Sequence, residues 1–291
     1  MISASIRSLL FTPGNHPDKV TKVFNANADV AILDLEDAVA LSQKITTRFL
    51  VVEALKLSRE CMGYVRINAA DTEFYEGDLT TVIGPWLDGI ILPKVETADQ
   101  LLAVDAHIRE LEISNELRPG NIDLIPIIET AKGLVEVAKI SGCGSRIRRI
   151  SFGAVDFAKD LGMKLSLDEW ELSSARSSIV LASRISGLEA PIDSVWVHYK
   201  DLDGLKVSSQ RVCDMGFRGK MCIHPAQVPI INNVFTPSDE EVSQAQKIVA
   251  AFEKAEANGS ASTQIDGFFI DYPVVEQARR TIDLARAIKK V

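Results

Sequence analysis

Short apolar runs alternate with longer amphipathic stretches along most of the 291-residue chain. The apolar runs are rich in Val, Ile and Leu, which is typical of strands buried in a parallel sheet. The stretches between them are long enough to form helices, so the pattern predicts repeated βα units. The predicted strands number eight: Ser8–Thr12, Val30–Asp34, Tyr64–Ile67, Gly89–Leu92, Leu124–Ile128, Arg149–Phe152, Ser194–Val197 and Lys220–Ile223.

Helices are predicted between these strands and beyond the last one. They comprise Pro17–Asn25, Gln43–Leu57, Asp78–Ile83, Ala98–Asn115, Ala131–Ile140, Leu172–Arg184 and Leu205–Met215, with an eighth after His224. Thr236 or Ser238 before an acidic turn predicts a further, capped helix, and a last helix is expected from Val274 to the end. The small and polar stretch Ala257–Gln264 is interpreted as a flexible hinge before the C-terminal tail.

Eight βα units favour one fold of the α/β class, the closed (β/α)8 TIM barrel. An open, doubly wound sheet is the alternative, but no strand is followed by a G-x-G-x-x-G or P-loop motif. We predict a barrel domain over residues 1–235 and a C-terminal helical extension over residues 236–291.

The charge and cysteine content mainly exclude certain partners and certain kinds of site. The chain has 32 Lys plus Arg against 40 Asp plus Glu, a formal charge of -8, and no long run of one sign, so no nucleic-acid partner is expected. The 4 cysteines form no C-x-x-C pair, which argues against a zinc or redox motif and fits reduced thiols. No apolar run approaches the ~18 residues of a membrane span. We therefore expect a soluble, cytoplasmic protein, with a clipped organelle precursor as the alternative.

Polar residues follow the predicted strands, where the active site of an α/β barrel forms. Glu129 and Asp156 follow the fifth and sixth strands, and two carboxylates in one mouth repel each other unless a cation lies between them. A hard ion that prefers oxygen ligands fits this pair, so Mg²⁺ is predicted, with Mn²⁺ as its alternative. Either residue could instead be a surface carboxylate or a helix cap.

Arg66 lies in the apolar run YVRIN, where its burial requires an anionic partner. Its planar fork fits a carboxylate or 2-oxo acid; the alternative is a structural ion pair with Glu36 or Asp37. These two acids, in the segment LDLEDAV, are interpreted as an outer shell around the metal or as a helix cap.

The segment TPGNHPDK places the Pro13–Gly14 turn before a predicted helix that carries Lys19 and Lys22. Free backbone amides at such a turn and nearby lysines can bind an anion. Taken alone, this signal is weak, because any βα turn can contain Pro-Gly and surface lysines are usually only solvated.

Eight segments together carry a family resemblance that runs nearly from end to end. They are RSLLFTPGN (7–15), AILDLEDAVA (31–40), VRIN (65–68), GIILPKVE (89–96), IPIIETAKGL (125–134), SFGAVDFAKDLG (151–162), GFRGKMCIHPAQ (216–227) and IDYPVVEQARR (270–280). The chain resembles the citrate lyase beta subunit group of the HpcH/HpaI aldolase superfamily, which includes stand-alone citramalyl-CoA and malyl-CoA lyases.

The resemblance implies roles for several residues. Glu129 and Asp156 match the magnesium ligands, Glu129 also lies at the substrate, and Arg66 matches a substrate-binding and catalytic arginine. Asp271 matches the tail aspartate to which catalysis is assigned. Such enzymes are barrels that assemble as trimers or hexamers, and the resemblance implies that the tail caps a neighbouring subunit.

The resemblance also implies that the segment containing Phe11, Pro13, Gly14, Lys19 and Lys22 contacts coenzyme A.

One departure concerns the run before the tail aspartate. The family commonly has Gly-Lys-Met or Gly-Ser-Met there, whereas here Phe268 and Phe269 follow Gly267. Because of this difference, the resemblance does not define the residues at the rim of the acyl pocket.

The implied reaction is a reversible Claisen cleavage of a citryl, citramalyl or malyl thioester into an acetyl thioester and a 2-oxo acid. The carrier is CoA or an acyl carrier protein, and the 2-oxo acid stays open among pyruvate, oxaloacetate and glyoxylate. Three alternatives remain: a malyl-CoA-type thioesterase, a beta subunit active only within a citrate lyase complex, and an inactive scaffold.

Overall fold

Eight parallel strands form a closed barrel in chain order. The computed structural model describes residues 6–265 and 267–288. The strands are β1 Ser8–Pro13, β2 Val30–Asp34, β3 Met62–Arg66, β4 Gly89–Leu92, β5 Asp123–Ile128, β6 Ser151–Phe152, β7 Ile192–Asp193 and β8 Gly219–Cys222. The predicted TIM barrel is therefore confirmed.

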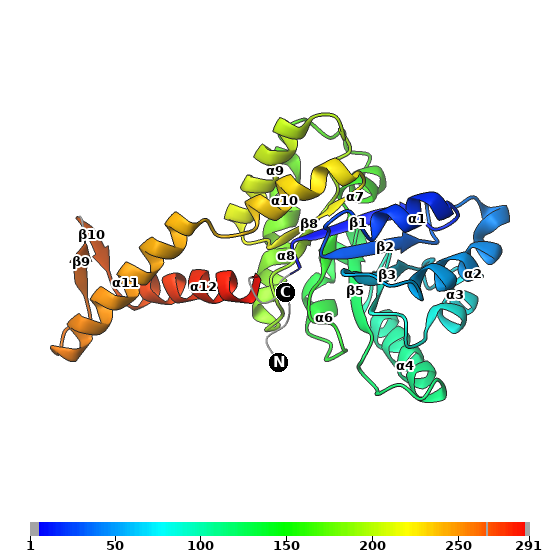
Figure 1. The fold of residues 1–291 in the computed structure, drawn as a ribbon, viewed down its shortest axis with the longest axis horizontal. Helices are drawn as coiled ribbons and strands as arrows, with labels where there is room; N and C mark the ends of the chain where they lie inside the picture. Colours follow the sequence, from blue (N-terminus) through cyan, green and yellow to red (C-terminus); the bar gives the residue numbers. More distant parts are fainter. Residues whose placement is uncertain (1–5, 266, 289–291) are drawn as a thin grey trace. The chain divides into compact units, whose positions relative to one another are not determined.

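Helices follow the strands and cover the outside of the barrel. They are α1 Pro17–Val23, α2 Lys44–Leu55, α3 Tyr75–Val82, α4 Ala98–Ser114, α5 Ala131–Val135, α6 Val137–Ser141, α7 Ala154–Leu161, α8 Ser173–Ile185, α9 Leu202–Met215 and α10 Val228–Val234. In Figure 1, α2, α3 and α4 follow one another around the outside of the first strands.

The interior of the barrel is filled by apolar side chains rather than left open. Buried residues from β1, β2, β3, β4, β5, β7 and β8 pack into one cluster, among them Leu9, Ile32, Ile91 and Met221. Strands of a barrel alternate inward-facing and outward-facing residues, and the inward-facing residues stack in layers. The filled interior leaves the C-terminal ends of the strands as the place for a site.

Strand β7 is shorter than the sequence predicts and begins earlier. The apolar run Ser194–Val197 predicts the strand, but the ladder instead joins Ile192 and Asp193 to β8. Asp193 is fully buried because Arg176 and Lys220 both bind its carboxylate. A buried aspartate inside a strand interrupts the apolar pattern. The predicted strand therefore begins two residues after the observed one.

Two helical details also differ from the sequence prediction. The predicted helix Ala131–Ile140 is divided at Glu136 into α5 and α6. Helix α7 was not predicted; it ends at Gly162, whose φ of 66° is a left-handed conformation that glycine adopts without strain.

The C-terminal residues form a second compact unit, which begins at Asn233, whereas the barrel unit covers Ile6–Asn232. Helix α11 (Asp239–Ala257) is capped by Ser238 in a capping box with Glu241, as the acidic turn predicts. Helix α12 (Tyr272–Ile288) packs against it through Ala245, Ala278 and Ile282.

A short antiparallel hairpin lies between these two helices, formed by β9 (Thr263–Ile265) and β10 (Phe268–Ile270). The predicted hinge Ala257–Gln264 overlaps both neighbouring elements, because Ala257 ends α11 and Thr263 and Gln264 belong to β9. Residues 258–262 join the two elements inside the C-terminal unit, and a hinge there stays a prediction. Small polar residues mark turns as well as linkers, and here they precede a hairpin.

Within residues 6–265 and 267–288, no helix combines the length and apolarity that crossing a membrane requires.

Candidate active site

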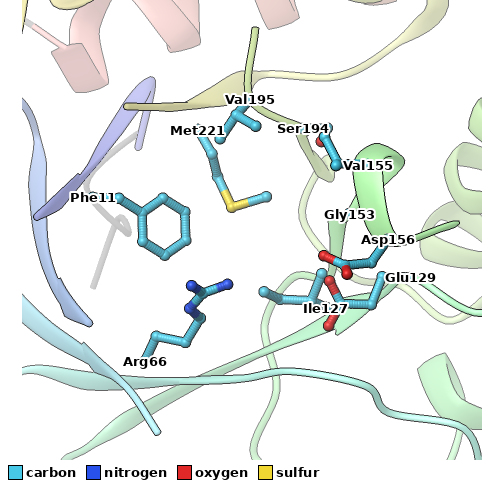
Figure 2. A pocket seen from close by; sticks show the side chains of 10 residues that line it. All are labelled: Phe11, Arg66, Ile127, Glu129, Gly153, Val155, Asp156, Ser194, Val195 and Met221. Atoms are coloured by element: carbon cyan, nitrogen blue, oxygen red, sulfur yellow. The ribbon is translucent and has the colours of Figure 1, made fainter. Parts of the chain in front are cut away.

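A pocket lies at the C-terminal ends of the barrel strands. Its lining comprises Phe11, Arg66, Ile127, Glu129, Gly153, Val155, Asp156, Ser194, Val195 and Met221. Figure 2 shows Glu129 and Asp156 pointing into this pocket, with Arg66 and Phe11 on the other side of it. Four residues that the sequence singled out therefore line one cavity, although they come from four different segments of the chain.

Glu129 is a buried carboxylate at the mouth of the barrel. It directly follows β5, and Thr130 after it caps α5 by accepting the Gly133 N–H at 3.0 Å. The Lys94 N–H donates to Glu129 Oε1 at 2.8 Å. Burial, followed by the negative charges of Glu36 and Asp156, raises the pKa of Glu129 to about 8. The site thus holds more negative charge than its own side chains neutralise.

The second oxygen of Glu129 faces Gly153. A Cβ added at Gly153 would lie 2.4 Å from Glu129 Oε2, so only glycine allows the carboxylate to lie there. Asp156, half-buried in the first turn of α7, contributes the other carboxylate. Among the described residues, no group of three His, Cys, Asp or Glu side chains could hold a metal ion.

A magnesium ion fits this arrangement. It needs only one or two protein carboxylates, because water and substrate oxygens complete its octahedron. Glu129 keeps Oε1 on a backbone amide, which orients its other oxygen for a ligand. Burial and the neighbouring carboxylates raise the pKa of Glu129, and a bound cation would offset both effects by stabilising the ionised form.

Arg66 is held in place by acidic residues at the end of β2 and in the loop after it. Its Nε and Nη2 donate to the two oxygens of Asp34 at 2.7 and 2.6 Å. Its Nη1 lies 3.1 Å from Glu36 and 3.8 Å from Asp37. The ion pair with Glu36 that the sequence offered as an alternative is present, yet Arg66 also lines the pocket, and its guanidinium stacks on the Phe11 ring at 4.8 Å.

The acidic loop rests on a buried polar network. The Lys44 ammonium donates to the backbone oxygens of Leu35 and Glu36 at 2.9 and 2.8 Å, and to Asn68 Oδ1 at 2.6 Å. Asn68 in turn donates to Asp78. Because each of these buried groups has partners, the network fixes the backbone that carries Glu36 and Asp37.

Glu36 and Asp37 differ in their surroundings. Glu36 is buried, and its burial raises its pKa despite the opposing charges of Arg66 and Lys94. Asp37 keeps 55% of its side chain exposed. Of the two, only Glu36 is buried against both Arg66 and Lys94.

The TPGN turn lies at the end of β1. The Gly14 N–H donates to Asp34 O at 3.0 Å, and a Cβ at Gly14 would lie within 2.9 Å of Val51, Asp34 and Thr47, so glycine is required for close packing. Lys19 and Lys22 are exposed on α1.

Asp271 belongs to the C-terminal unit. It immediately precedes α12, and its Oδ1 accepts the Val274 N–H at 3.4 Å. This contact caps the start of α12, and a capping carboxylate can still act on a ligand. Its catalytic role stays a prediction.

Sequence reasoning overlooked two charged residues of the site. The sequence prediction assigned no individual role to Lys94 or Asp34, but Asp34 binds Arg66 through both oxygens, and Lys94 contacts Glu36 and Glu129. Arg66 and Asp34 occupy paired positions of β3 and β2, a register that the pattern of residue types does not reveal.

A TIM barrel with buried carboxylates and an arginine in its mouth defines a class of enzyme scaffold whose chemistry lies at the strand ends. The model of the HpcH/HpaI aldolase/citrate lyase family matches residues 7–225. The chain belongs to this family, as the motifs of the sequence indicate.

Relatives of known name cover almost the whole chain. The citrate lyase subunit beta of Leuconostoc mesenteroides subsp. cremoris is 35% identical over 285 residues, which are 97% of this chain and 93% of that protein. A (3S)-malyl-CoA thioesterase of Cereibacter sphaeroides is 36% identical over 288 residues, 97% of this chain and 95% of that protein.

A solved structure is also similar along its full length. The protein CitE from Mycobacterium tuberculosis, in complex with magnesium, acetoacetate and coenzyme A, superposes with a TM-score of 0.80 at 30% identity, covering 97% of this chain and 99% of that chain.

Proposed function

We propose that the protein is a magnesium-dependent lyase that cleaves a citryl, citramalyl or malyl thioester into an acetyl thioester and a 2-oxo acid. The observation that carries this proposal is the meeting of Glu129, Asp156 and Arg66 in one pocket at the barrel mouth. The family of the chain and the magnesium and coenzyme A bound to the similar CitE structure support it.

In this proposal Glu129 and Asp156 hold Mg²⁺, with Mn²⁺ as an alternative ion. When bound, the ion supplies Lewis-acid stabilisation of negative charge on substrate oxygens. Arg66, fixed in its plane by Asp34, binds the carboxylate end of the substrate and stabilises the same developing charge. Glu36 and Asp37 contribute an outer shell around these groups.

Coenzyme A, or an acyl carrier protein arm, contacts the segment of Phe11, Pro13, Gly14, Lys19 and Lys22. The exposed ammonium groups of Lys19 and Lys22 suit its phosphates.

Asp271 acts as the proton donor that converts the thioester enolate into the acetyl thioester. We infer that the extension from residue 236 serves as a lid on a neighbouring subunit, in a homotrimer or hexamer. A lid excludes water from the enolate and orders a single acid at the reacting carbon.

The direct test is an assay of citramalyl-CoA, citryl-CoA and malyl-CoA with Mg²⁺ and the isolated chain. Cleavage of one of them should yield acetyl-CoA together with pyruvate, oxaloacetate or glyoxylate in equal amounts. Lack of cleavage of all three, in the presence of bound Mg²⁺, would exclude a stand-alone lyase. Turnover only of acyl carrier protein thioesters within a citrate lyase complex would identify a complex-dependent beta subunit.

A thioesterase is the second candidate, and the thioesterase relative in Cereibacter sphaeroides favours it. In that case water attacks the thioester carbonyl, and malyl-CoA yields free CoA and malate. Free CoA as the sole thiol product would replace the lyase proposal by this one.

The shared site has its own experiment. Asp271→Asn and Glu129→Gln chains are each expected to be inactive, whereas subunit exchange between them should restore part of the activity if Asp271 acts in trans. Mixed oligomers that are verified by mass and stay inactive would exclude action in trans.

A further inference from the structure

Lys94 has an unusual backbone conformation at the barrel mouth. It follows β4, and its φ is 53°. A positive φ is strained for a residue with a side chain and persists where surrounding contacts hold it. The other non-glycine residues with positive φ in the described part of the chain lie elsewhere: Asn27 after α1, Glu116 after α4 and Glu169 before the 3₁₀ helix Trp170–Leu172.

This conformation aims one backbone amide at the proposed metal ligand. The Lys94 N–H donates to Glu129 Oε1 at 2.8 Å. At the next residue the chain returns to β5, where the Val95 N–H donates to Ile127 O at 3.3 Å. A residue confined to negative φ could not keep the Lys94 amide on Glu129 and the Val95 amide on Ile127 together, so the contact that orients the carboxylate would be weakened.

The side chain of Lys94 reaches a different acid. Its ammonium donates to Glu36 Oε1 and lies 3.9 Å from Asp37. The other oxygen of Glu36 lies 3.1 Å from Arg66 Nη1. Glu36 is therefore shared between two cations, and Lys94 links the carboxylate that holds the metal to the arginine that binds substrate.

We infer that Lys94 is a positioning residue with two separable actions: its backbone amide orients Glu129 for Mg²⁺, and its ammonium occupies Glu36 so that Arg66 stays available to the substrate carboxylate. This inference rests on the proposed function and deepens it. Lys94 acts through Glu129 and Arg66 and does not itself react.

The backbone action is tested with three variants that all lose the ammonium. Asn and Gly adopt positive φ readily, whereas Val is strongly disfavoured there. In calorimetric titrations of the full chain with Mg²⁺, Lys94→Asn and Lys94→Gly should bind at least as tightly as the wild type, because a nearby positive charge is gone. Lys94→Val should bind about tenfold more weakly, the loss typical of a removed outer partner.

Far-ultraviolet circular dichroism selects folded variants for this comparison. If Lys94→Asn and Lys94→Gly weaken Mg²⁺ binding as much as Lys94→Val does, the backbone action is overturned. Asn and Gly provide two independent chances to retain the conformation, and about tenfold weaker Mg²⁺ binding in both would overturn the backbone action even if Lys94→Val is unfolded.

The side-chain action is tested with Lys94→Met and Lys94→Arg on the thioester that the wild type cleaves. Without the ammonium, Glu36 competes with the substrate for Arg66, so Lys94→Met should raise KM about tenfold, as expected for a lost hydrogen bond to a charged group. Lowering of kcat should be smaller, and Lys94→Arg should restore KM. Wild-type KM in Lys94→Met, or no restoration by Arg, would overturn this action.

Failure of this inference is distinguishable from failure of the proposed function. A wild-type chain that neither binds Mg²⁺ nor cleaves a thioester contradicts the function. A wild type that does both, with Lys94 variants that match it in KM and Mg²⁺ affinity, contradicts only the role of Lys94.

Discussion

Strand β5 carries a buried carboxylate at each of its ends, and the two have opposite surroundings. Asp123 begins the strand and Glu129 follows its last residue, roughly 20 Å further at the rise of a strand. Asp123 accepts from the Tyr64 hydroxyl at 2.8 Å and from Arg149 Nη1 at 2.7 Å, and Arg148 lies 3.5 Å away. Glu129 instead faces the carboxylates Glu36 and Asp156.

The difference separates a stabilising cluster from a binding site. At the N-terminal end, Asp123 pairs with Arg148 and Arg149, and Arg149 pairs with Glu189 as well, so loss of Asp123 would leave a buried guanidinium with less compensation. At the mouth, burial and then the like charges of Glu36 and Asp156 raise the pKa of Glu129 to about 8, which disfavours the ionised form unless a cation binds. The N-terminal face of a TIM barrel serves stability and the C-terminal face serves chemistry.

Glu129→Gln should give the largest functional effect. We expect kcat/KM to fall by about a thousandfold or more, because a bound metal contributes several kcal/mol to charge stabilisation. Mg²⁺ affinity, measured by calorimetry, should fall in parallel, and Asp156→Asn should behave in the same way. The fold should persist, since the uncharged amide removes repulsion. Unchanged Mg²⁺ affinity in both variants would contradict the assignment of the site.

Asp123→Asn is the matched variant at the other end of the strand. It leaves the buried Arg149 with less compensation, so the free energy of unfolding should fall by about 3 kcal/mol. Urea denaturation measures this loss, and Mg²⁺ affinity of the folded protein should stay at the wild-type value. A variant as stable as the wild type, or one with weakened Mg²⁺ binding, would contradict the assignment of stability to the N-terminal end and of metal binding to the C-terminal end.

The sequence predicted the barrel and most strand ends because apolar runs and helix signals agree along the chain. It also brought Glu129, Asp156 and Arg66 together, since residues that follow parallel strands meet at one mouth. It missed the backbone conformation of Lys94 and the bidentate partner Asp34, because neither φ nor pairing between strands is visible in a pattern of residue types.

The errors share a physical cause, which is tertiary contact that overrides local pattern. Asp193 looks like a loop residue, but the arginine and lysine that surround it allow its burial in β7. The stretch Ala257–Gln264 looks like a linker, but it leads into the hairpin between α11 and α12. Asp193 depends on Arg176 and Lys220, and strand β9 depends on β10. A local sequence pattern does not show either pairing.

Arg66→Lys should give a smaller effect than loss of Glu129. A lysine keeps the charge but loses the planar fork that binds both oxygens of Asp34, and it cannot stack on Phe11 in the same way. We expect kcat/KM to fall by about ten- to a hundredfold, equivalent to one lost charge-assisted hydrogen bond. Steady-state kinetics measure this, and turnover near that of the wild type would make Arg66 only a partner of Asp34 and Glu36.

The pH dependence of metal-free stability should be the smallest and most diagnostic difference. Because the pKa of Glu129 is raised in the folded chain to about 8, folding favours its protonated form. Its contribution to stability is therefore greatest below its ordinary pKa, and falls as the pH rises through that value towards 8. Mg²⁺ needs the ionised carboxylate, so the rise in Tm on adding Mg²⁺ should grow between pH 6 and pH 9.

Thermal unfolding in EDTA and in Mg²⁺ measures both trends. Glu129→Gln is the control, because other titrating groups remain in it: subtracting its pH profile from that of the wild type isolates Glu129. A wild-type Mg²⁺ shift that is equal at pH 6 and pH 9 would show that the carboxylate is already ionised at the mouth, and would remove the contrast with Asp123.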